Sequence, residues 1–357
     1  MPKTPPAPPP PKPAPPRRGR KNVFIHDVAR IAGCSISTVS KALNGTGSIS
    51  AKTRKRIAKI SEEVGYTPNA AAKALRGRRS ENIGILFFPS CIDLFLSPFY
   101  GSVAAGAERV LSARNYNFLL AGTEWKGEDL RLPKFIVERS VDGVLLLGKI
   151  PGSLLESLQD TELPFVLLDH ELPDPTIDMV VTDNYSGAVA AVRRLLDAGH
   201  RRVAMLAAEQ DDPSTLARLN GYRTTLLERD LLHPDLVVRG PHSEDGGLAA
   251  ATALLRSAKP FTALFCVNDS MAIGAIKALR DAGLAVPRDV SVIGFDDLHV
   301  SRFFTPALTT VRVDQFLMGS IGADILLDKL ADEGHAPCKR IVPAQLVERD
   351  SVAAPRG

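Results

Sequence analysis

Short polar side chains gather at the start of a helix predicted at residues 35–43, where they could read the bases of a nucleic acid. Ser37, Thr38 and Lys41 carry hydroxyl and ammonium groups that form hydrogen bonds with base edges. An α-helix fits the major groove of DNA, and side chains near its N-terminus reach the bases. This pattern predicts base recognition, and simple exposure of Ser37 and Thr38 to solvent is the alternative.

A second polar group, Asp296 and Asp297, ends a strand predicted at residues 290–295. Paired carboxylates can act as general acid and base, but a pair at a strand end more commonly binds a polar ligand or begins a helix. The sequence shows no P-loop, no nucleophile elbow and no dinucleotide-binding glycine motif after the first predicted strand. The seven histidines have no metal-binding spacing. We therefore expect a binding protein without cofactor or metal, and not an enzyme.

Positive charge is concentrated at one end of the chain. Residues 1–80 contain 17 Lys or Arg and three acidic residues, a net charge of +14, whereas the whole chain carries +4. The rest of the chain is therefore acidic, with a net charge of −10. This asymmetry predicts a polyanionic partner for the N-terminal end, because basic residues on an ordinary solvated surface are spread more evenly.

The cysteines and the chain ends indicate a cytoplasmic location. Cys34, Cys91, Cys266 and Cys338 are far apart, which favours buried thiols in a reducing cytosol over a disulfide framework or a metal site. No apolar run has the length of a membrane span. The first residues are proline-rich and lack the apolar segment of a signal peptide.

The N-terminal elements predict a small helical domain behind a tail. Residues 1–21 hold ten prolines within the first 16 and a basic run at 17–21, so we expect a disordered tail that either adds phosphate contacts or only aids solubility. Gly33 supplies a turn, Ser35 caps the second helix, and a third helix runs from about residue 50 to 64. The first helix has an apolar stripe of Ile25, Val28, Ala29 and Ala32.

From residue 82 onward, short apolar runs alternate with helical patterns, which predicts parallel sheets covered by helices. The repetition is long enough for two sheets. Predicted strands lie at 83–88, 117–121, 144–147, 165–168, 203–206, 236–238, 263–267 and 290–295. Predicted helices begin at 101 and span about 128–139, 185–198, 216–230, 246–257 and 270–282.

Residues 23–350 resemble the LacI/GalR family of bacterial transcription regulators. The motifs that carry the resemblance occur in the family's order at residues 27–44, 66–69, 72–75, 199–204, 268–274, 287–297 and 306–311. The resemblance implies an N-terminal all-α helix-turn-helix headpiece, a hinge helix and an α/β core. That core would consist of two doubly wound parallel-sheet lobes, similar to type I periplasmic binding proteins. It also implies a dimer whose affinity for DNA changes when a small effector binds between the lobes.

The resemblance also implies domain boundaries. They are a tail at 1–21, a headpiece at 22–67, a hinge helix and linker at 68–81, a core at 82–350 and a tail at 351–357. The N-lobe would take about 82–181 and 311–341, and the C-lobe about 182–310 and 342–350. Because no heptad repeat follows the core, we expect a homodimer on a roughly palindromic operator in double-stranded DNA.

The resemblance assigns DNA contacts to two helices. They are Ile36, Ser37, Thr38, Ser40, Lys41 and Asn44 in the recognition helix, and Ala72 and Leu75 in the hinge helix. Leu75 would enter the minor groove and bend the DNA, as apolar wedges do, unless it only packs on the headpiece. The family's usual Thr before the first helix is Phe24 here, so another residue, such as Asn22, must cap that helix.

The resemblance places the effector site beyond the carboxyl ends of strands and at helix starts, where parallel sheets bind ligands. Its expected residues are Phe99, Tyr100, Asp169, Arg218, His242, Asn268 and Asp296. Charged and amide groups form hydrogen bonds with hydroxyls, and ring faces stack on sugar C–H groups. The alternatives are a helix-capping role for Asp169 or Asp296 and a core position for Tyr100.

These expectations combine into a sequence-specific repressor whose operator affinity is controlled by a sugar-like effector. The alternatives are a transporter's sugar-binding protein, an enzyme on a doubly wound fold, and the same regulator controlled by a partner protein. The basic headpiece and missing signal peptide argue against the first, and the missing catalytic constellation argues against the second.

Overall fold

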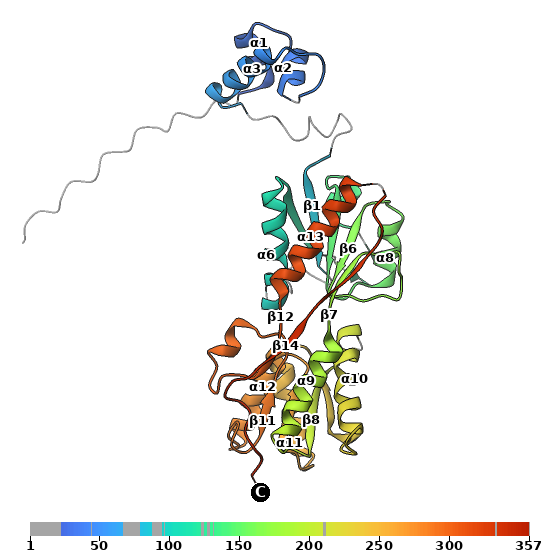
Figure 1. The fold of residues 1–357 in the computed structure, drawn as a ribbon, viewed down its shortest axis with the longest axis vertical. Coiled ribbons are helices and arrows are strands. Elements are labelled where there is room, and N and C mark those ends of the chain that lie inside the picture. The colour runs from blue at the N-terminus through green and yellow to red at the C-terminus, as the bar shows by residue number, and fades with distance from the viewer. Residues whose placement is uncertain are drawn as a thin grey trace, which may run out of the picture. The chain divides into compact units, whose positions relative to one another are not determined.

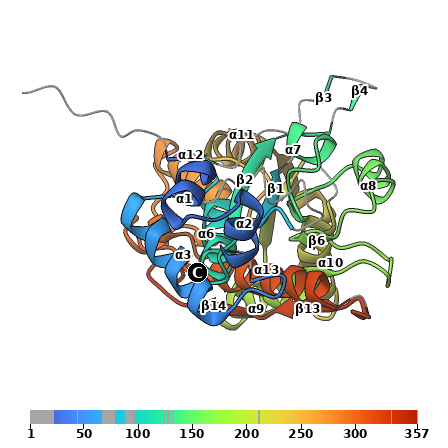
Figure 2. The ribbon, with the colours of Figure 1, turned by 90° about the horizontal axis from the view of Figure 1, so that it is seen from above.

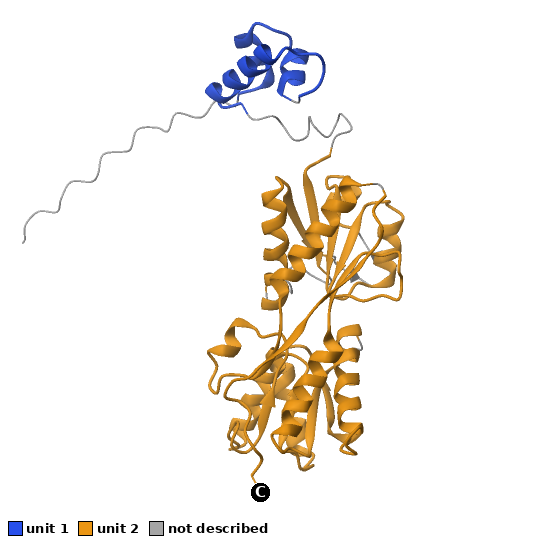
Figure 3. Ribbon diagram, viewed as in Figure 1, with its two compact units in different colours: residues 1–78 blue, residues 79–357 orange. Residues whose placement is uncertain are grey.

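The structure is a computed structural model, and it describes residues 23–43, 45–66, 79–87, 95, 97–122, 125–126, 129–130, 132–209, 212–332 and 334–356. The chain forms two compact units, residues 1–78 and 79–357, which Figure 3 distinguishes by colour. Several predicted features lie outside the described residues: the tail at 1–21, Asn22, Asn44, Cys91, and the hinge helix with Ala72 and Leu75.

The first unit contains three helices around one small core (Figure 1). They are α1 (Ile25–Ala32), α2 (Ile36–Leu43) and α3 (Ala51–Val64). Each helix contributes one almost fully buried side chain at the centre, namely Val28, Val39 and Ile57. The predicted helices and their common core are therefore confirmed.

Asp27 takes part in capping the start of α1, and Asn22, the cap suggested from the sequence, lies outside the described residues. Phe24 has no side-chain oxygen, and instead Asp27 Oδ2 accepts a hydrogen bond from the Phe24 N–H at 3.1 Å. The cap therefore comes from a carboxylate within the first turn, and this hydrogen bond lowers the pKa of Asp27. Gly33, with a φ of 62°, allows the turn into α2, and Ser35 caps α2 as predicted, accepting from its backbone at 3.1 Å.

The second unit begins with a six-stranded sheet that we call the N-lobe sheet, in the order β13-β7-β6-β5-β1-β2. All its neighbouring strands are parallel. The strands are β1 (Asn82–Phe87), β2 (Asn117–Gly122), β5 (Gly143–Leu147), β6 (Phe165–Leu168), β7 (Met179–Thr182) and β13 (Lys339–Val342). The helices are α6 (Pro98–Ala113), α7 (Lys134–Val137), α8 (Gly152–Gln159) and α13 (Gln315–Ala331). Figures 1 and 2 place α6 and α8 on opposite sides of this sheet.

The C-lobe sheet has four parallel strands in the order β11-β10-β8-β9. They are β8 (Val203–Ala208), β9 (Val237–Gly240), β10 (Ala263–Cys266) and β11 (Ser291–Ile293). The helices are α9 (Asn184–Asp197), α10 (Pro213–Leu227), α11 (Glu244–Arg256), α12 (Asp269–Asp281), and the 3-10 turns η1 (Pro234–Leu236) and η2 (His299–Arg302). An antiparallel pair, β12 (Thr310–Val313) with β14 (Ala344–Val347), completes this part. The prediction of two parallel sheets is confirmed.

Some elements differ from the prediction. The helix expected at 128–139 is only α7, because Pro133 precedes it and proline cannot continue a helix through its own position. Upstream lies a short hairpin of β3 (Trp125–Lys126) and β4 (Asp129–Leu130). Among the described residues, no helix is both long and apolar enough to cross a membrane.

Candidate functional site

A cavity of about 380 Å³ in the second unit is lined by residues that follow strands of both sheets. This volume lies within the range of small-molecule sites. All seven residues expected at the effector site line it: Phe99, Tyr100, Asp169, Arg218, His242, Asn268 and Asp296. The structure thus brings together side chains that are up to 197 positions apart in the sequence. Their role in binding an effector stays a prediction.

The N-lobe wall of the cavity is built around Tyr100 and Asp169. Ser97 caps α6 and so places Tyr100 in the first helical turn. The Tyr100 hydroxyl donates a hydrogen bond to Asp169 Oδ2 at 2.9 Å. The centroid of the Tyr100 ring lies 4.8 Å from that of the Phe87 ring. Burial raises the pKa of Asp169 to about 6, although the charge of Arg218 and the tyrosine hydrogen bond oppose the shift. The polar ends of both side chains therefore face the cavity, and Asp169 caps no described helix.

The C-lobe wall is centred on Arg218, which is 6% exposed. Its Nε donates to Asn184 Oδ1 at 2.8 Å and its Nη1 to the Val267 carbonyl at 2.5 Å. The guanidinium carbon lies 3.8 Å from the centroid of the Phe295 ring. Its Nη2 lies 3.3 Å from Asp296 Oδ1. Arg218 is thus held rigidly on three sides while it faces the cavity.

The adjacent carboxylates Asp296 and Asp297 have different surroundings. Burial raises the pKa of Asp296 to about 8, against the opposing charge of Arg218. Asp296 Oδ1 is buried and contacts Arg218 Nη2 at 3.3 Å, and it accepts no hydrogen bond of good geometry among the described residues. Asp297 instead pairs with Arg312 at 2.7 Å and with Arg349 at 2.5 Å. The two carboxylates therefore do not form the acid and base pair considered from the sequence.

Two helix starts present further polar groups to the cavity. Asn268 Oδ1 caps α12 by accepting from the Met271 N–H at 2.8 Å, which leaves its amide nitrogen to donate to a ligand. Asp212 caps α10 through Thr215 N–H at 2.8 Å. The capping role considered for Asp169 and Asp296 thus belongs to their neighbours in the cavity.

Sequence reasoning missed several polar residues of the cavity. They are Ser97, Lys149, His170, Glu209, Asp212, Ser214 and Thr215. The seven expected residues came from the family resemblance, but strand ends could also have indicated two of the missed residues, because Lys149 comes two residues after β5 and Glu209 directly follows β8. His170 is buried, and burial lowers the pKa of its imidazole.

The first unit presents the predicted recognition residues on α2. Ile36 is 48% exposed, and Ser37 and Lys41 are exposed as well. Thr38 is half-buried, and its hydroxyl lies 2.9 Å from that of Ser35. Ser40, which the resemblance assigns to DNA contact, is only 4% exposed, because α2 packs into the core at Val39 and Ala42.

Comparisons with known proteins cover most of the chain. Residues 24–69 match the family described as bacterial regulatory proteins, lacI family, and residues 192–352 match the periplasmic binding protein-like domain. The HTH-type transcriptional regulator CelR of Thermobifida fusca is 34% identical over 336 residues, or 93% of this chain and 99% of that protein. The similarity therefore spans both structural units.

Solved structures show the same architecture. The Lac repressor dimer bound to operator and the anti-inducer ONPF has a TM-score of 0.80 and 26% identity, covering 94% of this chain and 100% of that one. A CelR–cellobiose complex has a TM-score of 0.72 and 33% identity, covering 92% and 99%. A LacI family regulator from Enterococcus faecium with bound ribose has a TM-score of 0.69 and 26% identity, covering 77% and 100%. These relatives are named as repressors or regulators of transcription.

Proposed function

Because this chain belongs to the LacI/GalR family of bacterial DNA-binding transcriptional regulators, we propose that it is a cytoplasmic, dimeric repressor released from or recruited to its operator by a small effector. The effector binds in the cavity between the two sheets. The observation that carries this proposal is the cavity itself, because all seven expected effector residues line it. The α2 surface with Ile36, Ser37 and Lys41 reads the operator.

The effector that fits this cavity is a neutral, hydroxyl-rich sugar. Asp169, Glu209, Asp212 and Asp296 line it against the cationic Lys149 and Arg218. Even when Asp296 is protonated, three carboxylates face two cations. A sugar hydroxyl donates to a carboxylate and accepts from a guanidinium or amide, whereas an acidic group would be repelled by this excess of negative charge.

Arg218 does not provide the free cation that a sugar acid or phosphate requires. Its nitrogens already contact Asn184, Val267 and Asp296. Its remaining role is to orient a neutral ligand by hydrogen bonding at the edge of the cavity. The solved relatives with cellobiose and ribose support a sugar, and none of these relatives supports control by a partner protein.

Isothermal titration calorimetry with matched ligand pairs tests the effector class. The pairs are galactose with galacturonate, ribose with ribose 5-phosphate, and cellobiose with cellobionate. We expect one neutral member to bind and its acidic counterpart to bind at least tenfold more weakly. Tighter binding of the acidic member would overturn the neutral class, and silence across a wider sugar panel would favour the partner-protein alternative.

Variants of cavity residues test whether the cavity controls operator binding. Arg218→Ala should abolish the effector response in a gel-shift titration with an operator selected from genomic DNA, while specific DNA binding persists. Arg223→Ala is the matched control, because Arg223 is exposed on the same helix and does not line the cavity. Asp169→Asn is a second, nearly isosteric variant, which should weaken effector binding and leave operator affinity unchanged. A normal response in Arg218→Ala would refute the site.

A further inference from the structure

A cluster of three potential metal ligands lies in the second unit outside the cavity. It consists of Asp178, His335 and Cys338, whose ligand atoms all lie within 4.8 Å of one another. Asp178 directly precedes β7 and Cys338 directly precedes β13, and these two strands are parallel neighbours. The cluster therefore lies at the amino edge of the N-lobe sheet, whereas the cavity lies beyond the carboxyl ends. It belongs to neither the effector site nor the DNA-reading surface.

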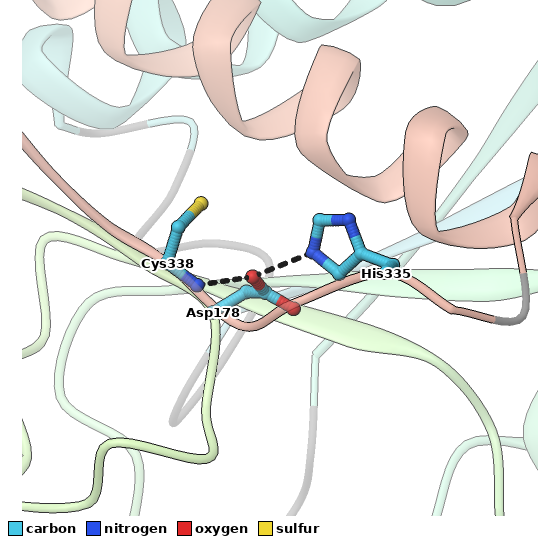
Figure 4. Close-up of side chains that lie close together, drawn as sticks. All are labelled: Asp178, His335 and Cys338. Carbon is cyan, nitrogen blue, oxygen red and sulfur yellow. Dashed lines mark hydrogen bonds and ion pairs between the residues drawn. The ribbon is translucent and has the colours of Figure 1, made fainter.

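We propose that Asp178, His335 and Cys338 form a binding site for one divalent transition-metal ion, with Zn²⁺ as the natural occupant. A carboxylate, an imidazole and a thiolate are the ligand types that Zn²⁺ takes from proteins, and three of them leave a fourth tetrahedral position for water. Figure 4 shows Asp178 between Cys338 and His335, with both residues linked to the same carboxylate oxygen. An ion in this position replaces the proton of the Cys338 thiol and the hydrogen bond from His335 to Asp178.

The carboxylate is positioned as a metal ligand would be. Asp178 is fully buried. Its Oδ1 accepts hydrogen bonds from His335 Nε2 and from the Cys338 backbone N–H, both at 2.9 Å. Its Oδ2 accepts from Lys329 Nζ at 2.8 Å. An ion bound to Oδ1 would replace the hydrogen bond from His335, while Lys329 continues to hold Oδ2 by an outer hydrogen bond, as is common for ligating carboxylates.

The surrounding charges permit a divalent ion. Lys329 is 27% exposed and Arg340 lies near Cys338, so two cations oppose the ion. The Asp178 carboxylate and the thiolate of Cys338 offset them from within the ligand sphere. Thiolate with imidazole favours Zn²⁺ or Co²⁺ over Mg²⁺ or Ca²⁺, which prefer oxygen ligands alone.

The ion would fasten the end of α13 to the sheet beside the start of the core. His335 and Cys338 lie on the connection from α13 to β13. Arg79, the first residue of the second unit, donates to the Leu330 carbonyl in the last turn of α13. Metal binding therefore stabilises the part of the core where the chain enters from the first unit.

Cobalt titration of the full-length protein tests the site directly. Apo protein prepared with a chelator and a reductant is titrated with Co²⁺, and the absorption spectrum is followed. We expect a thiolate-to-cobalt charge-transfer band that saturates at one ion per chain and disappears when Zn²⁺ is added. Zn²⁺ should also raise the thermal unfolding midpoint of the wild-type protein.

Single-ligand variants decide between metal binding and a simple hydrogen-bonded contact. Cys338→Ser should abolish the charge-transfer band, and His335→Gln should weaken Co²⁺ binding at least tenfold. Cys34→Ser is the matched control, because it removes another half-buried thiol and should leave the band unchanged. Far-ultraviolet circular dichroism without metal verifies that each variant is folded. A wild-type protein without the band, or a band that survives in Cys338→Ser, would overturn the proposal.

Discussion

At the scale of the residue, the chemistry of the cavity depends on two buried carboxylates, Asp169 and Asp296, whose pKa values are raised to different extents. Asp169 is buried enough to raise its pKa, while Tyr100 and Arg218 favour its ionised form. Within the same cavity, Asp296 has its pKa raised further, to about 8. At neutral pH, Asp169 is thus mostly an acceptor for ligand hydroxyls. Because the two carboxylates differ in this way, we expect the proposed effector binding to depend on pH.

Effector affinity should fall as the pH decreases through about 6. Protonation of Asp169 removes the acceptor, so each pH unit below 6 weakens binding about tenfold if only the ionised form binds. The pKa of Asp296 is raised to about 8, above this pH range, so we expect its titration to contribute little to this step. Tyr100→Phe removes a hydrogen bond that favours ionised Asp169. The midpoint of the pH profile of effector binding should therefore move to higher pH in this variant. Calorimetry from pH 5 to 7 measures the effector affinity of the wild-type protein and of Tyr100→Phe. An effector affinity of the wild-type protein that does not change with pH would contradict the role of Asp169.

At the scale of the element, the N-lobe depends on close contact between helices from distant parts of the chain. A Cβ added to Gly106 of α6 would lie 1.9 Å from the Phe316 carbonyl oxygen, and one added to Gly319 of α13 would lie 1.9 Å from that of Val103. These glycines allow the two backbones to touch. Helices packed this closely cannot accept even a methyl group without separating.

Gly106→Ala should therefore lower the free energy of unfolding by about 1–3 kcal/mol. Gly101→Ala in the same helix is the matched control, because nothing lies within 4 Å of its added Cβ. That control should be neutral or stabilise by up to about 1 kcal/mol, since alanine favours the helix more than glycine does. Urea denaturation measures both variants. Equal stability of the two would contradict the close contact.

The elements also show what the sequence can and cannot predict. Alternating apolar runs identified most strands of both sheets, whereas the seven expected cavity residues came from the family resemblance and lie where parallel sheets bind ligands. Helix α13 was not predicted, because apolar residues occur on most of its faces where it packs on α6 and on the sheet, so no single stripe marks it. The Asp178 cluster was also missed, because Asp178 is 157 positions from His335 and only the pairing of β7 with β13 brings them together.

At the scale of the whole molecule, the segment between the two units is expected to control operator binding. Leu75 lies outside the described residues, and its role as a minor-groove wedge rests on the family resemblance. Leu75→Ala should weaken specific operator binding more than tenfold and leave effector affinity unchanged. Leu227→Ala, which shortens a 63% exposed leucine of α10, is the control. Unchanged operator affinity of Leu75→Ala in a gel-shift titration would reject the wedge.

If the first unit binds the operator and the second binds the effector, the two binding affinities should be coupled reciprocally. If effector changes operator affinity by some factor, operator must change effector affinity by the same factor, typically about 5–150-fold. We would measure the effector Kd by calorimetry with and without saturating operator, and the operator Kd with and without saturating effector. Equal ratios support direct coupling, whereas unequal ratios indicate an additional equilibrium such as dimer dissociation. Arg218→Ala should show no shift in the operator Kd, and ratios of one in the wild-type protein would contradict the proposed regulation.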